Sequence, residues 1–186
     1  MSKIFKSATE LIGNTPLVEL TNFEKELGLE ATVLAKIREL VSMLPANNDD
    51  DAFFEDCTDD LNRACENMEG AVADPAIALS QISDNGQVFE VKSAYAKEMV
   101  TALIKLDGVT VGAVANRTAL YDEEGKEAET FDGTLSAEGA EKAAEFVSFC
   151  DAFEIPVLTL TNVKGYKACK CSEKRLAKAL AHLTSA

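Results

Sequence analysis

Residues 98–116, EMVTALIKLDGVTVGAVAN, contain the clearest structural signal in the chain. Two runs rich in β-branched and aliphatic residues flank the pair Asp107-Gly108. This pair readily adopts the positive φ angles of a tight turn. The pattern therefore predicts two strands that form a hairpin.

The segment that follows predicts a helix packed on this hairpin. Ser136 is a suitable N-cap residue, and the apolar residues after it recur at helical spacing on one side. That side comprises Ala140, Ala143, Phe146, Val147, Cys150 and Phe153. We expect it to lie against a sheet.

A strand and a further helix complete the unit. Residues 155–163, IPVLTLTNV, are almost continuously apolar, which predicts a strand in a parallel arrangement with both faces covered. The strand ends at Lys164-Gly165-Tyr166, and Ser172 begins the last helix. The inward side of that helix comprises Leu176, Ala179, Leu180 and Leu183. Together these elements describe a ββαβα unit of an α/β fold with a right-handed crossover.

Two elements are expected before the hairpin. Asp74 can cap a helix whose first residue is Pro75, and Asn85-Gly86 can close that helix. Residues 87–91 then have the composition of a strand.

The first third of the chain carries weaker signals. Residues 7–12 form a short helical candidate, and residues 16–20 and 31–35 have the composition of strands. A one-sided apolar spacing predicts a helix over 37–44. Residues 47–60 carry seven acidic side chains and predict a solvated connector. They lack the ligand spacing and turn glycine of a calcium loop.

The composition limits the function. A net charge of −14 disfavours nucleic acid and anionic membrane surfaces as partners, because either requires concentrated positive charge on the protein. No run is apolar enough for membrane insertion, so we expect a cytoplasmic protein. The five cysteines are irregularly spaced and the chain has one histidine, which predicts reduced thiols and no metal site.

Residues 1–36 resemble the start of cysteine synthase, a pyridoxal phosphate (PLP) enzyme, in the segments SATELIGNTPLVELTN and ATVLAK. In that family a Ser-Val-Lys-Asp-Arg motif follows and supplies the Schiff-base lysine. This chain has IRELVS in its place, and Lys36 precedes the motif. The resemblance therefore implies no PLP lysine and no PLP cofactor here, and the segment is too short to form an independent domain.

From about Arg38 onward the chain resembles the acyl-CoA carboxyltransferase subunit of biotin-dependent carboxylases and decarboxylases. The matching segments are RELVSMLPANN, FEVKSAYAKEMVTALIKLDGVTVGAVAN and KAAEFVSFCDAFEIPVLTLTNVKGY. The methylmalonyl-CoA and glutaconyl-CoA decarboxylase subunits are the nearest members. The resemblance implies a partial crotonase-like ββα spiral over 73–186, after a helix and acidic connector over 37–72. The two resemblances meet at residues 36–38, where gene fusion, misassembly and a cloning artefact look alike.

The carboxyltransferase resemblance also implies a site built from backbone amides, whose dipoles stabilise developing negative charge. Gly165 and Tyr166 follow a strand and precede a helix, so their N–H groups are the candidate catalytic donors. Asn116 and Val163 are the candidate biotin-binding residues. Two alternatives stay open: Gly165 only turns the chain, and Asn116 is an exposed turn residue. Lys164 stands where the family commonly has proline.

The implied activity moves a carboxyl group between carboxybiotin, held by a biotin carboxyl carrier protein, and an acyl-CoA substrate, within a homo-oligomer. In this family a second glycine-rich turn and an acyl-CoA-binding half complete the site. We expect this chain to be a truncated, inactive piece with an uncovered sheet edge. The alternatives are a non-catalytic oligomeric assembly module and a cysteine synthase relative without its Schiff-base lysine.

Overall fold

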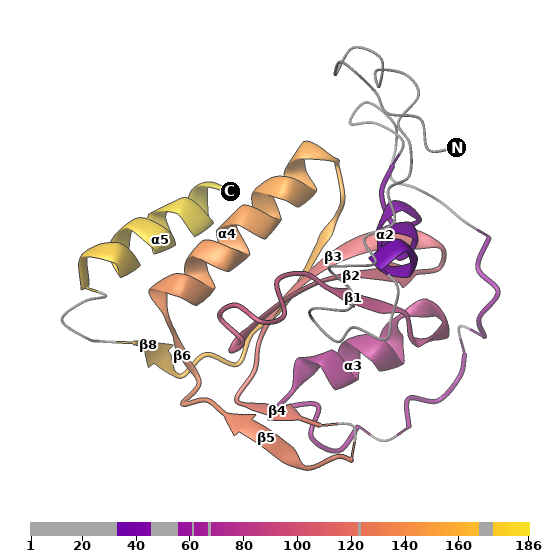
Figure 1. Cartoon of the computed structure of the whole chain (residues 1–186), viewed down its shortest axis with the longest axis horizontal. Coiled ribbons are helices and arrows are strands. Elements are labelled where there is room, and N and C mark those ends of the chain that lie inside the picture. The colour runs from indigo at the N-terminus through magenta and orange to yellow at the C-terminus, as the bar shows by residue number, and fades with distance from the viewer. Residues whose placement is uncertain (1–32, 46–55, 61, 67, 123, 168–172) are drawn as a thin grey trace, which may run out of the picture. The chain divides into compact units, whose positions relative to one another are not determined.

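The structure is a computed structural model that describes residues 33–45, 56–60, 62–66, 68–122, 124–167 and 173–186 (Figure 1). Its packing divides the chain into two units, Met1–Leu40 and Val41–Ala186.

Helix α2 (Val33–Val41) holds the described residues of the first unit and ends on the first residue of the second. The predicted strand over 31–35 is therefore wrong at residues 33–35, and the predicted helix begins at Val33 instead of residue 37. Six of the nine residues in this helix are Leu, Ala, Lys, Arg or Glu, which are strong helix formers. Lys36 also pairs with Glu39 one turn away at 2.8 Å. The elements predicted over 7–12 and 16–20 lie outside the described residues.

The second unit is built on a four-stranded sheet in the order β1-β2-β3-β7. Strands β1 (Val88–Glu90), β2 (Met99–Leu106) and β3 (Val109–Asn116) are antiparallel neighbours. Strand β7 (Val157–Leu160) pairs with β3 in parallel, as the sequence predicted for the strand after the helix.

The predicted hairpin between β2 and β3 is confirmed. Asp107 and Gly108 have φ angles of 51° and 77°, and the residues on either side of them are paired. The carboxylate of Asp84 accepts hydrogen bonds from the amides of both turn residues, at 3.0 and 2.7 Å. The turn is thus held by its own geometry and by a side chain from outside the hairpin.

Two helices cover opposite faces of the sheet (Figure 1). Helix α3 (Pro75–Ile82) packs its buried Leu79 on one face. The strand residues of that face are Val100, Ala102, Ile104, Val111, Ala113 and Ala115. Helix α4 (Ala137–Ala152) lies on the other face, where Phe146 and Cys150 contact Gly112.

Both predicted helix caps are confirmed. The Asp74 carboxylate accepts from the Ala76 amide at 3.1 Å with Pro75 at the first helical position, and Ser136 Oγ accepts from Gly139 N at 2.9 Å. Helix α3 ends at Ile82 with Ser83 as C-cap, and the predicted closing pair Asn85-Gly86 instead lies in the 3₁₀ turn η2 (Asp84–Gly86) that follows.

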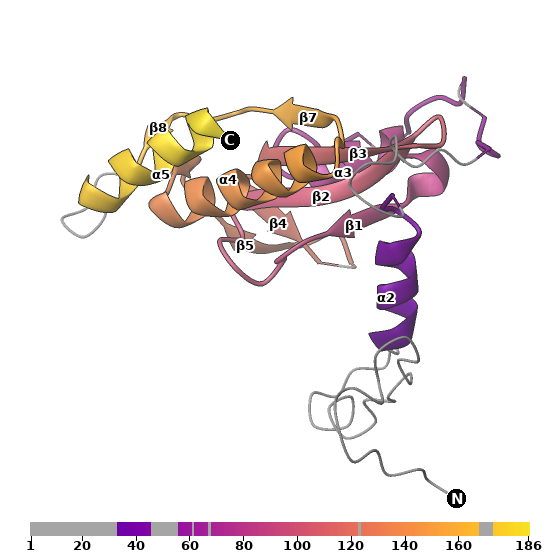
Figure 2. The same cartoon turned by 90° about the horizontal axis from the view of Figure 1, so that it is seen from above.

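Helix α5 (Glu173–Ser185) lies along α4 (Figure 2). The predicted inward side is confirmed, because Ala179 is buried against Ala137 and Ala140 of α4. The half-buried residues around this contact are Leu135, Leu176 and Leu180.

Strand β7 differs from the prediction. The sequence suggested a strand over 155–163 with both faces covered, but β7 spans only Val157–Leu160, and its residues alternate between exposed and half-buried. Leu158 and Leu160 pack into the core beneath α3, whereas Val157 and Thr159 point to the face that carries α4. Because β7 is the last strand in the sheet order, α4 leaves that face of β7 open.

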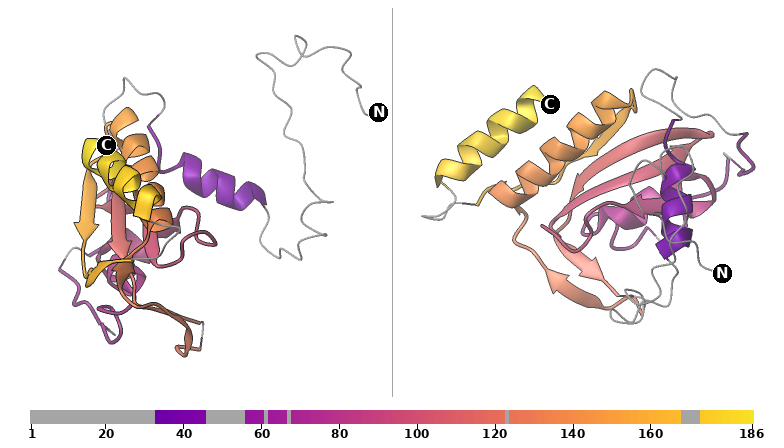
Figure 3. Two further views of the ribbon diagram at one scale, coloured as in Figure 1. Left: turned by 90° about the vertical axis from the view of Figure 1, so that its left-hand side faces the viewer. Right: turned by 45° about the horizontal axis from the view of Figure 1, so that its top comes forward.

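Two small strand pairs were not predicted. Strands β4 (Ala119–Tyr121) and β5 (Glu127–Thr130) form an antiparallel hairpin that projects beyond the four-stranded sheet (Figure 3). The exposed sequence EAET of β5 has no apolar alternation that would reveal it. Strand β6 (Thr134–Leu135) pairs in parallel with β8 (Gly165–Tyr166), which joins segments 31 residues apart.

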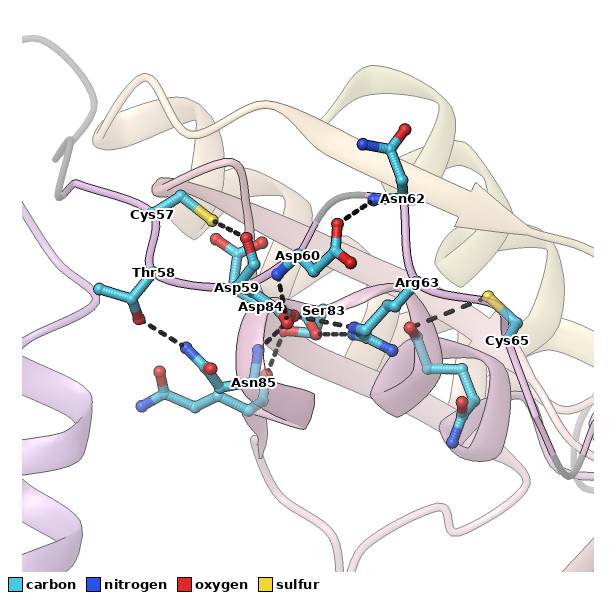
Figure 4. A network of polar contacts seen from close by, with 12 residues as sticks. Cys57, Thr58, Asp59, Asp60, Asn62, Arg63, Cys65, Ser83, Asp84 and Asn85 are labelled. Atoms are coloured by element: carbon cyan, nitrogen blue, oxygen red, sulfur yellow. Dashed lines mark hydrogen bonds and ion pairs between the residues drawn. The ribbon is translucent and has the colours of Figure 1, made fainter.

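The end of the acidic connector is anchored to the core (Figure 4). The Asp59 carboxylate accepts hydrogen bonds from Arg63 Nε and Asn85 N at 2.9 and 2.8 Å, and Arg63 Nη2 donates to the Ser83 carbonyl at 2.8 Å. Residues 46–55 of the connector lie outside the described part. Among the described residues no helix is long and apolar enough to cross a membrane.

Candidate functional site

A groove of about 430 Å³ opens beside the carboxyl ends of β3 and β7. Its walls come from β2, β3, β7, α4, α5 and the segment after β7. Among the lining residues are Met99, Asn116, Ala143, Val157, Val163 and Leu183. The groove is mainly apolar and exists because α4 does not extend over the outer half of β7.

Asn116 ends β3 at the inner wall of this groove and is only 9% exposed. Its side-chain Nδ2 donates to the Asn162 carbonyl at 2.9 Å, and its Oδ1 accepts from the Asn162 amide at 2.6 Å. The alternative that Asn116 is an exposed turn residue is therefore wrong. Its amide is satisfied by the backbone after β7, so it holds that segment in place while it lines the groove.

Val163 lies on the same segment and also lines the groove, with 42% of its surface exposed. The structure thus brings the two predicted biotin-binding residues to one cavity, although they are far apart in the sequence. Neither of the predicted amide donors is among the lining residues of this groove.

Gly165 and Tyr166 lie just beyond the groove in β8 and pair with Thr134 and Leu135. On either side of them, Lys164 N donates to Gly133 O at 2.9 Å and Lys167 N donates to Leu135 O at 3.0 Å. The sequence placed these two residues between a strand and a helix, and the structure shows that they themselves form a short paired strand. Among the described residues, no atom outside those adjacent to Gly165 lies within 4 Å of the position that its Cβ would take, so this side of the backbone is open to them.

A buried group of charged side chains supports this end of the sheet, and no sequence pattern indicated it. Arg117, which follows β3, is 2% exposed; its Nη2 donates to Glu90 at 3.0 Å, and its Nε lies 3.4 Å from the Asp74 carboxylate. Its backbone amide donates to Glu98 O at 2.8 Å. Charges so thoroughly removed from water are stable only when paired, so these contacts fix the entrance to β2.

Lys142 of α4 is a second buried charge near the groove, and it is only 1% exposed. Its Nζ donates to the carbonyls of Tyr95 and Met99 at 2.9 and 2.6 Å. Burial lowers the pKa of this ammonium from 10.5 to about 8, although Glu90 and Glu98 act in the opposite direction. A lysine among alanines on a helix is usually solvated, so the sequence provided no signal for this residue.

The described residues contain no cluster of His, Cys, Asp and Glu suited to a metal ion. The site therefore consists of an apolar groove, backbone groups at its rim and buried polar side chains that position the rim. Such a site can bind a flat, mostly apolar group and present amide dipoles to it.

Residues 27–186 match the family model of the carboxyl transferase domain, and the chain belongs to this family. It is similar to the propionyl-CoA carboxylase beta chain of Roseobacter denitrificans (34% identical over 144 residues) and to the methylmalonyl-CoA decarboxylase subunit alpha of Veillonella parvula (31% over 144 residues). Each match covers 74% of this chain and 26% of the relative.

The structure is similar to the crystal structure of transcarboxylase 12S with hydrolysed methylmalonyl-coenzyme A bound, with a TM-score of 0.68 and 31% identity. That match covers 80% of this chain and 28% of the other. The predicted fold class, a partial crotonase-like α/β spiral, is confirmed. The chain spans about a quarter of the length of the curated relatives it matches. The resemblance of residues 1–36 to cysteine synthase gains no support from these matches and stays a prediction.

Proposed function

We propose that this chain provides part of the site of a biotin-dependent acyl-CoA carboxyltransferase, with the groove as its biotin pocket. The observation that supports this most is that Asn116 and Val163 line one groove whose rim leads directly to Gly165 and Tyr166. The relatives named above act on propionyl-CoA and methylmalonyl-CoA, which supports an acyl-CoA as the second substrate.

The lining fits the chemistry of biotin. The thiophane ring and the valeryl chain of biotin are apolar, and the walls at Val157, Val163 and Leu183 offer apolar surface of matching kind. Asn116 holds residues 161–163 in position as one wall. When bound, biotin supplies the carboxyl group for transfer.

The amides of Gly165 and Tyr166 are the proposed donors to the ureido oxygen, where negative charge develops. Fixed N–H dipoles in a site with little water stabilise such charge without reorganisation. Gly165 suits this role because no described residue fills the space beside its Cα, so a ligand can approach the backbone closely. The pairing of β8 with β6 keeps these two residues in a defined orientation.

The proposed partners are a biotin carboxyl carrier protein, an acyl-CoA and other copies of the chain. The chain spans about a quarter of its relatives' length, so we assign it one part of a site and not the whole reaction. We expect that the chain alone, given carboxylated carrier protein and propionyl-CoA, releases no carboxylated product. Measurable turnover in that assay would contradict this expectation.

Binding of a biotinylated carrier domain, compared with the same domain before biotinylation, tests the proposal. We expect biolayer interferometry to show biotin-dependent binding, and Val163→Arg to weaken it at least tenfold, about 1.4 kcal/mol, because the arginine places a charge in the apolar groove. Val72→Arg is the matched control, since Val72 is exposed and does not line the groove. Equal binding by the two carrier forms would reject the proposal.

A further inference from the structure

The loop of residues 91–98 joins β1 to β2 at the groove end of the sheet. Met99 follows this loop, pairs with Asn116 and lines the groove. Glu98, the last loop residue, accepts a hydrogen bond from the Arg117 amide at 2.8 Å. The position of the loop therefore determines one wall of the groove.

The 91–98 loop contains two residues in an unfavourable backbone conformation. Lys92 has a φ of 52° and Ala96 a φ of 41°, and neither is glycine. Each costs about 1 kcal/mol or more relative to an ordinary conformation. A loop with this cost keeps its shape only if the surrounding structure holds it.

Helix α4 supplies that support. Lys142 Nζ donates to the carbonyls of both Tyr95 and Met99, so one buried nitrogen joins the middle of the loop to its end. Glu145 pairs with Lys92, and Ser136 at the start of α4 donates to the Glu98 carboxylate. A neutral amine still has two N–H donors, so both Lys142 bonds persist in either protonation state.

A buried lysine contributes less to the stability of a fold than an apolar side chain of similar size. Burial in an apolar interior disfavours the charged form, and a methionine of similar length would fill the same space without that cost. What methionine lacks is the pair of donors that hold the loop. The presence of lysine at this position thus points to the loop conformation as the property that it provides.

The loop held in this way presents an aromatic side chain to solvent. Tyr95 is 46% exposed although its carbonyl is bound to Lys142. Arg175 of α5 is also exposed, and its guanidinium pairs with Glu138 and Glu141 of α4 at 3.0 and 2.9 Å. Tyrosine and arginine are the residue types that most often dominate binding energy at protein interfaces.

We propose that Lys142 is a positioning residue that holds the 91–98 loop so that Tyr95 contacts the biotin carrier protein when its biotin enters the groove. This inference rests on the proposed function. A protein whose prosthetic group reaches Met99 comes close to the adjoining loop, because Tyr95 O and Met99 O share one hydrogen-bond donor. A rigid aromatic residue at that place adds contact area at little cost in conformational entropy.

The first test concerns the loop and needs no ligand. Trypsin can cut after Lys92 and Lys97 within the loop, and after exposed Lys126 in the β4–β5 turn as an internal reference. In the full chain we expect Lys142→Met to speed the two loop cleavages at least tenfold while cleavage after Lys126 is unchanged. Lys142→Gln, which keeps an NH₂ donor pair, should restore part of the protection. A folded Lys142→Met chain with parental loop cleavage rates would overturn the positioning role.

The second test uses an exposed residue, so it holds even if Lys142→Met does not fold. We expect Tyr95→Ala to weaken binding of the biotinylated carrier domain at least tenfold and Tyr95→Phe to change it less than twofold. Parental affinity of Tyr95→Ala, together with a loss in Val163→Arg, would overturn this inference and leave the proposed function standing. No binding by the parent chain would overturn both the proposed function and the Tyr95 contact, whereas the cleavage rates would still decide the role of Lys142.

Discussion

The sulfur of Cys150 packs directly against Gly112 and leaves no room for a side chain there. A Cβ added to Gly112 would be only 2.5 Å from Cys150 Sγ. This contact brings α4 close to β3 and fixes the helix over the sheet. The helix then ends short of β7, which leaves the groove open beside Val157 and Thr159.

Gly112→Ala should lower the free energy of unfolding by about 1–3 kcal/mol, since the new methyl group overlaps the sulfur in a well-packed core. Urea denaturation followed by circular dichroism measures the loss. The double variant Gly112→Ala/Cys150→Ala should recover part of it, because the atom in conflict is gone. Strictly additive effects of the two substitutions would contradict this packing relationship.

Asp84→Asn should destabilise the chain by about 1–3 kcal/mol, because the new NH₂ group faces one of the two turn amides that the carboxylate now accepts. Asp60→Asn is the matched control. Asp60 is exposed and, within the described part of the chain, its carboxylate accepts from the nearby Asn62 amide, so its substitution should change stability by less than about 0.5 kcal/mol. Equal denaturation midpoints for both variants would show that the Asp84 contacts contribute nothing.

Lys142 should make stability depend on pH in the alkaline range. Its pKa in the folded chain is about 8, below the ordinary value of 10.5, so the unfolded chain holds this proton more tightly. Below pH 8 the cost of burying the charge is fully present, and it falls as pH rises from about 8 to 10.5. The unfolding free energy of the parent minus that of Lys142→Met should therefore increase with pH across this window, by about 1–3 kcal/mol.

Subtracting the two unfolding free energies cancels the contributions of the other titrating groups, because both chains contain them. Urea midpoints at pH 7, 8.5 and 10 supply the measurement. A difference that stays flat would show that Lys142 has an ordinary pKa in the folded chain, and one that decreases with pH would show a raised pKa.

Asn116→Ala should loosen the segment after β7, because it removes both hydrogen bonds to the Asn162 backbone. The expected loss of stability is about 1–3 kcal/mol. Hydrogen exchange at residues 161–163 should become faster, and binding of the biotinylated carrier domain should weaken. Asn62→Ala, at an exposed position, serves as control. Unchanged exchange in Asn116→Ala would mean that other contacts hold this wall of the groove.

The cysteines should differ strongly in reactivity. Burial raises the pKa of the Cys150 thiol to about 11, whereas Cys65 is exposed. Because only the thiolate reacts with iodoacetamide, native chain at pH 8 should label at Cys65 at least about a hundredfold faster than at Cys150. Peptide mass spectrometry reads this ratio, and denaturant should abolish it. Comparable native labelling of both residues would disprove the close packing of α4 on β3.

Local chemistry accounts for the successful structural predictions. Asp107-Gly108 forms its turn, and Asp74 and Ser136 cap their helices, because each depends on atoms within a few residues along the chain. The inward sides of α4 and α5 follow from helical periodicity in the same way.

The errors and omissions arise where distant segments meet. The apolar run of β7 indicated a strand but not its place at the end of the sheet, which leaves Val157 exposed. The short pairing of β6 with β8 and the hairpin of β4 with β5 have no periodic pattern of their own.

For the candidate site, too, local sequence accounts for some features and contacts between distant segments account for the others. Short sequence motifs were enough to select Asn116, Val163, Gly165 and Tyr166 through a family resemblance. The residues that surround them are determined by the tertiary structure. Asn116 became a buried support only because Asn162 returns beside it, and Lys142 became part of the rim only because α4 crosses the 91–98 loop. Backbone preference and periodicity are properties of neighbouring residues in the chain, whereas burial, cavities and charge pairing depend on which remote segments come into contact.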